Sequence, residues 1–121
     1  MRQAVIVSYA RTGLAKAARG SFNQTSNMAM LGHAIRHAVD RSGAAPEEVE
    51  DVVAGCVAAS GNVARAGALL AGLPITTAGA TVHRACSSGL NAIANAAHYV
   101  ENEGADIVGK SDSQLFEERL V

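Results

Sequence analysis

The sequence is poor in aromatic side chains and contains no tryptophan. Phe and Tyr make up 3% of the 121 residues, whereas hydrophobic residues of all kinds make up 49% and charged residues 17%. This composition excludes disordered and collagen-like chains. We therefore expect one compact domain, whose single core is built from aliphatic side chains and many alanines, with closely packed backbones.

The sequence also lacks a strong net charge and long apolar runs. Its formal net charge is -1, and attraction to nucleic acid or anionic membranes depends on clustered Lys and Arg. We therefore expect neither nucleic acid nor a membrane as partner. No uncharged apolar run reaches membrane-spanning length, and the first residues contain no apolar stretch typical of a signal peptide. These observations predict a cytoplasmic protein.

Cysteines and nucleotide-binding motifs are scarce as well. With no export signal, Cys56 and Cys86 are expected to be reduced thiols, and Cys56, inside a predicted apolar strand, to be buried and structural. Neither GxGxxG nor GxxxxGK[ST] occurs. His33 and His37 lie four residues apart on a predicted helix, but no third ligand is visible. We expect no metal and no cofactor.

Strand and helix patterns alternate along the chain. Short runs rich in β-branched residues predict strands at 3–9, 52–57, 75–83 and 105–108. Stretches with helical periodicity predict helices at about 26–41, 63–71 and 86–102, the last with a buried stripe beginning at Leu90. The alternation predicts right-handed βαβ crossovers, and hence the α/β class with a mostly parallel sheet of βαβ units covered by helices.

The most informative segment joins the third predicted strand to the third predicted helix. Cys86 lies at this junction, where unsatisfied backbone N–H groups and the positive end of the helix dipole favour a thiolate. Gly89 leaves room for a neighbouring backbone or a substrate. The residues alone leave two interpretations open: Cys86 is an activated nucleophile at a strand-to-helix elbow, or it is a small buried hydrophobe.

Residues 82–94, Val-His-Arg-Ala-Cys-Ser-Ser-Gly-Leu-Asn-Ala-Ile-Ala, resemble the thiolase signature around the acyl-accepting cysteine. Further matches follow the same order at residues 5–12, at the strand end Gly55, at 62–65 and at 72–74. The resemblance covers residues 3 to about 109, the opening part of a thiolase. It predicts a truncated thiolase-like N-terminal domain at 1–110, the incomplete N-terminal half of a thiolase-like fold, and a divergent tail at 111–121.

The resemblance implies an acyl-CoA acyltransferase in which Cys86 is the catalytic residue and accepts an acyl group as a thioester. A coenzyme A thioester is then a substrate, not a cofactor. Thiolases consist of two similar βαβαβαββ halves that dimerise, and a second cysteine and histidines from later in the chain serve acid–base chemistry and oxyanion binding. This sequence lacks those later motifs, so we expect an incomplete enzyme. The expected partners are acyl-CoA and either a second copy or a complementing thiolase chain.

Some features leave alternatives open. His83 replaces the Asn that thiolases usually carry three residues before the cysteine, and strand alternation favours a bystander role for it. Arg65 is expected either to contact a partner or a CoA phosphate, or simply to solvate its helix. A ketoacyl-synthase-like enzyme is another possibility, although Gly89 favours a thiolase. The main alternative is a non-catalytic truncated fragment that acts as an interaction or dimerisation piece.

Overall fold

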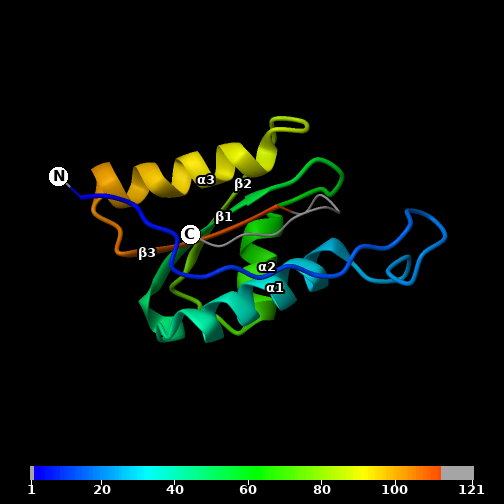
Figure 1. Ribbon diagram of the computed structural model, residues 1–121, viewed down its shortest axis with the longest axis horizontal. Coiled ribbons are helices and arrows are strands. Elements are labelled where there is room, and N and C mark those ends of the chain that lie inside the picture. The colour runs from blue at the N-terminus through cyan, green and yellow to red at the C-terminus, as the bar shows by residue number, and fades with distance from the viewer. Residues whose placement is uncertain (1, 113–121) are drawn as a thin grey trace.

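A computed structural model describes residues 2–112 of the chain. Its strands form one parallel sheet in the order β2-β1-β3. Helices α1 and α2 cover one face of this sheet and α3 covers the other (Figure 1). The predicted α/β class is therefore confirmed. In chain order the elements are α1 (Asn27–Ser42), the 3-10 turn η1 (Pro46–Glu48), β1 (Val49–Gly55), α2 (Val63–Ala71), β2 (Ala78–Val82), α3 (Ser88–His98), the π-helical turn η2 (Tyr99–Glu103) and β3 (Ile107–Asp112).

The first two helices begin and end close to where the sequence predicts, because local signals fix their ends. The Ser26 hydroxyl accepts a hydrogen bond from a first-turn N–H of α1 at 3.1 Å, and the Asn62 side chain does the same for α2 at 3.1 Å. Gly43 and Gly72 end these helices with φ of 75° and 89°, a left-handed conformation that glycine adopts without strain. Within residues 2–112, no helix is long and apolar enough to cross a membrane.

The core lies on both faces of β1, whose side chains alternate between them. Val52 and Ala54 pack with α1 and α2, whereas Val53 packs against Ala92 and Ala96 of α3, and all five residues are fully buried. The alanines of α3 let the helix approach the sheet closely. This arrangement confirms the expected core of aliphatic and alanine side chains.

The prediction of a strand at 3–9 is wrong, because these residues form no strand pairing. A side chain takes up part of their backbone hydrogen bonding: the Ala4 N–H donates to the Glu101 carboxylate at 3.3 Å. An apolar run predicts extended backbone, but a strand also needs a neighbour, and within residues 2–112 β3 pairs only with β1. Four large hydrophobic side chains of this segment are more than half exposed, those of Val5, Ile6, Val7 and Tyr9.

The limits of the other strands follow their partners and not their composition. β1 begins at Val49 instead of residue 52, because Val49 lies opposite Ile107 of β3. β2 starts at Ala78 instead of residue 75, and β3 runs over 107–112 instead of 105–108. Hydrogen-bonded register is a tertiary property, which a single apolar run does not specify.

The third helix buries a different face from the one predicted. Leu90, the expected start of the buried stripe, is 72% exposed. The stripe against the sheet consists of small residues, Ser88, Gly89, Ala92 and Ala96. Both stripes repeat at three- and four-residue spacing, so periodicity cannot choose between them. Close contact with the sheet selects the smaller side chains.

The predicted boundary between a domain at 1–110 and a tail at 111–121 stays a prediction. Residues 113–121 lie outside the described part of the chain.

Candidate functional site

Cys86 lies at the carboxyl edge of the parallel sheet. β2 ends at Val82 and α3 begins at Ser88, so Cys86 belongs to the short turn between strand and helix. Its thiol is free and exposed. The interpretation of Cys86 as a small buried hydrophobe is therefore wrong, and the predicted elbow is present. The carboxyl edge is also where open parallel sheets bind ligands.

Ser88 holds this turn in place from beneath. Its fully buried hydroxyl accepts a hydrogen bond from Arg84 N at 2.8 Å and donates one to Ala85 O at 2.7 Å. Ala85 has a φ of 45°, which a residue with a Cβ adopts at some cost unless the surrounding structure enforces it. Cys86 directly follows these two anchored residues, so the turn carries its thiol at a defined place.

The start of α3 faces the turn without a side-chain cap. Ser87 occupies the N-cap position, but its hydroxyl donates to Arg84 O at 2.9 Å and makes no capping bond to the helix. The positive end of the helix dipole is therefore directed toward the turn that holds Cys86. A helix start of this kind stabilises a negative charge placed next to it, including a thiolate.

His83 takes no part in this arrangement. Its side chain is exposed and makes no hydrogen bond or ion pair within residues 2–112. The described structure therefore gives Cys86 no local imidazole base. This agrees with the bystander role expected from strand alternation.

Cys56 has a different environment from Cys86. It directly follows β1, is 3% exposed, and its sulfur accepts a hydrogen bond from Ala59 N at 3.4 Å. Both cysteines are free thiols. The two free thiols agree with the prediction of reduced cysteines. Cys56 is buried as predicted, although it follows β1 and does not lie inside the strand.

A contact of Arg65 with a partner or a CoA phosphate stays a prediction, but Arg65 does not simply solvate its helix. Its guanidinium donates one hydrogen bond to Ile75 O at 2.8 Å and another to Thr77 O. These bonds tie the first turn of α2 to the chain entering β2. The sequence does not reveal this role, because the acceptors are backbone carbonyls ten and twelve residues away.

Other titratable groups lie apart from Cys86. The rings of His33 and His37 contact each other edge-on, with centroids 4.3 Å apart. Within residues 2–112, no three His, Cys, Asp or Glu side chains are grouped to hold a metal ion. Burial raises the pKa of Asp51 near the start of β1, and a hydrogen bond from Val52 N opposes the rise. None of these groups belongs to the turn around Cys86.

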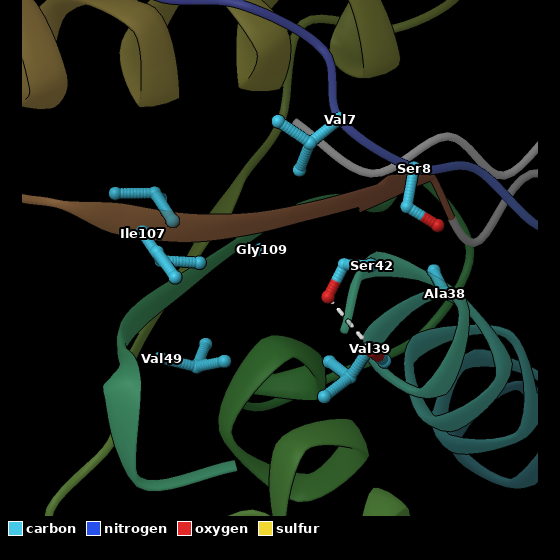
Figure 2. A pocket seen from close by; sticks show the side chains of 9 residues that line it. Val7, Ser8, Ala38, Val39, Ser42, Val49, Ile107 and Gly109 are labelled. Atoms are coloured by element: carbon cyan, nitrogen blue, oxygen red, sulfur yellow. Dashed lines mark hydrogen bonds between the residues drawn. The ribbon is translucent and has the colours of Figure 1, made fainter. Parts of the chain in front are cut away.

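A small apolar hollow lies beside β3, away from the thiol. Figure 2 shows Val7 and Ser8 on one side of it, with Val39 of α1 and Ile107 of β3 facing them. The Ser8 hydroxyl is buried and has no hydrogen-bond partner. Cys86 does not line this hollow. The hollow therefore does not identify substrate-binding residues for Cys86.

The fold and the site define an α/β protein with a parallel sheet and an exposed thiol on the turn before a helix. Residues 4–109 match the family description "Thiolase, N-terminal domain". The chain therefore belongs to the thiolase family through this domain, as the resemblance of residues 82–94 predicts.

Named relatives agree with this assignment. The chain is 39% identical over 107 residues to 3-ketoacyl-CoA thiolase 1, peroxisomal, of Arabidopsis thaliana. The matched region covers 85% of this chain and 24% of that protein. It is 38% identical over 104 residues to 3-ketoacyl-CoA thiolase of Bacillus subtilis, which covers 83% of this chain and 27% of that protein. The chain thus spans about a quarter of the length of these relatives. A cytoplasmic location stays a prediction, since the name of the plant relative places that protein in peroxisomes.

Solved structures share the fold. The acetyl-CoA acetyltransferase of Bacillus anthracis matches with a TM-score of 0.88 and 30% identity, over 93% of this chain and 29% of that chain. The acetyl-CoA acetyltransferase of Syntrophomonas wolfei matches with a TM-score of 0.83 at 23% identity, a likeness of fold alone. The described residues therefore share the fold of about 29% of the Bacillus anthracis chain.

Proposed function

We propose that Cys86 accepts an acyl group from acyl-CoA as a thioester, the first half of a thiolase-type acyltransferase reaction. The observation that carries this proposal is the exposed Cys86 thiol on a turn anchored by Ser88, in front of the uncapped start of α3. The names of the relatives, 3-ketoacyl-CoA thiolase and acetyl-CoA acetyltransferase, support acyl-CoA as the substrate class.

The proposed step is a thiol–thioester exchange. The Cys86 thiolate attacks the carbonyl carbon of the thioester and forms a new C–S bond. The bond between that carbon and the sulfur of coenzyme A then breaks, and coenzyme A leaves as a thiolate that water protonates. The proton lost by Cys86 also passes to water, because no histidine is bonded to the thiol within residues 2–112. Neither a metal nor a resident cofactor is required.

The second half of the proposed reaction needs acid–base groups, and within residues 2–112 no histidine is bonded to Cys86. Condensation or thiolysis requires proton transfer and a stabilised oxyanion, each of which contributes several orders of magnitude to the rate. We infer that the chain alone stops at the acyl-enzyme. A complementing thiolase chain or a second copy would then have to provide the remaining groups.

The direct test is intact-mass measurement after incubation with acetyl-CoA. We expect the unmodified chain and a Cys56→Ala variant to gain one acetyl group, because Cys56 is buried and Cys86 is exposed. A Cys86→Ser variant should gain none. The proposal fails if the unmodified chain gains no acetyl group, or if Cys86→Ser gains one to the same extent.

A further inference from the structure

We propose that Gly55, at the end of β1, is a positioning residue for Cys86. Alternation along β1 directs Val53 and Gly55 to the same face of the sheet, the face covered by α3. Val53 packs beneath the middle of the helix, against Ala92 and Ala96. Gly55 lies one step further along the strand, directly beneath the helix start.

The contact at Gly55 leaves no space for a side chain. A Cβ at this position would lie 2.6 Å from Ser88 C, 2.8 Å from Ser88 O and 2.7 Å from Gly89 N. These are backbone atoms in the first turn of α3, so they cannot rotate away as the end of a flexible side chain can. The missing side chain of Gly55 therefore sets how closely the start of α3 approaches the sheet.

Ser88 connects this contact with the turn that carries the thiol. The same residue that touches Gly55 binds Arg84 N and Ala85 O through its hydroxyl, and these two residues immediately precede Cys86. A displacement of Ser88 away from β1 must therefore move the turn that carries the thiol. Gly55 does not contact substrate in this proposal. Its effect on catalysis rests on the proposed acyl transfer to Cys86.

Gly79 provides a matched control on the neighbouring strand. A Cβ at Gly79 would lie 2.7 Å from Arg65 N and 2.8 Å from Arg65 Cα, so it would also strike helix backbone. That helix is α2, which is not part of the turn around Cys86. Gly55→Ala and Gly79→Ala therefore introduce the same methyl group into equally tight strand–helix contacts, and only Gly55→Ala displaces Ser88.

The experiment compares the two variants by cysteine-specific alkylation with iodoacetamide at neutral pH and by acetylation from acetyl-CoA. We expect Gly55→Ala to lower the alkylation rate of Cys86 by roughly two-fold to five-fold, because the thiol loses its place before the helix start. Acetylation of Cys86 should fall by roughly ten-fold to a hundred-fold, as for a misplaced reacting group. Gly79→Ala should leave both Cys86 rates unchanged.

Buried Cys56 separates positioning from loss of stability. If a variant merely unfolds more often, alkylation of Cys56 rises, and it should do so in both variants.

The inference is overturned if Gly55→Ala folds and keeps both wild-type rates at Cys86, or if Gly79→Ala lowers them equally. If Gly55→Ala does not fold, Ser88→Ala decides: a reduced alkylation rate of Cys86 supports the inference, and an unchanged rate overturns it. Alkylation needs no acyl-CoA, so this result stands even if the unmodified chain fails to form an acetyl adduct.

Discussion

Single polar side chains determine local geometry at two places in the chain. The Ser88 hydroxyl is fully buried and bonded on both sides, which turns a flexible connection into a fixed support for Cys86. Arg65 does the same for the entry to β2 through two backbone carbonyls. In both cases the side chain binds two main-chain groups.

Replacing Arg65 by Ala should destabilise the chain by about 1.5–3 kcal/mol, because charge-assisted hydrogen bonds to two carbonyls are lost. Arg65→Lys should not restore this stability, since an ammonium group lacks the planar fork that reaches both acceptors. Urea denaturation measures the free energy of unfolding.

The control for Arg65 is Arg36, another helical arginine. It makes one long hydrogen bond, 3.4 Å, to Leu70 O. We expect Arg36→Ala to change the free energy of unfolding by no more than about 0.5 kcal/mol. Equal losses for the two variants would contradict a structural role specific to Arg65.

At the scale of elements, close contacts between small residues hold helices to one another and to the sheet. α1 and α2 approach through Gly32 and Gly67: a Cβ at Gly32 would lie 2.8 Å from Leu70 Cβ, and one at Gly67 would lie 2.6 Å from Leu31 Cγ. Leu31 is fully buried, so it has little freedom to withdraw. The scarcity of aromatic residues in the sequence agrees with this packing.

Gly67→Ala should destabilise the chain even though alanine favours a helix by about 1 kcal/mol over glycine. Overpacking against Leu31 costs about 1–3 kcal/mol, which exceeds that gain over most of its range. Gly13, where a Cβ would meet nothing within 4 Å, provides the control. A higher thermal midpoint for Gly67→Ala than for the unmodified chain would contradict this account.

The same contacts explain what the sequence can and cannot predict. Caps such as Ser26 and Gly43 are local signals, so the limits of α1 are predictable. The segment 3–9 looks like a strand because its residues favour extension, but pairing depends on a neighbour that no local pattern reveals. Cys86 is predictable from its motif. The support that Gly55 and Ser88 give to it depends on a strand–helix approach visible only in three dimensions.

At the scale of the whole molecule, an extended apolar segment and an edge of the sheet lack a covering neighbour within residues 2–112. The segment 3–9 exposes more than half of Val5, Ile6 and Val7, and β3 pairs on one side only. Exposed apolar residues on extended backbone favour pairing with another chain. We therefore expect a second copy of the chain to associate through this segment and edge.

Sedimentation velocity should therefore show association that increases with protein concentration. Ile6→Lys should reduce it, because a charge on an extended edge opposes pairing. Ile75→Lys, at a position 81% exposed on another part of the surface, should leave it unchanged. A monomer at every concentration, or an equal effect of both lysines, would contradict this prediction.

The most direct test of the central claim is to locate the acetyl group after incubation of the chain with acetyl-CoA. Peptide mass mapping should find it on Cys86 as a thioester that neutral hydroxylamine removes, with Cys56 unmodified. Acetyl groups found only on lysines, or on both cysteines to the same extent, would contradict the assignment of Cys86 as the acyl acceptor.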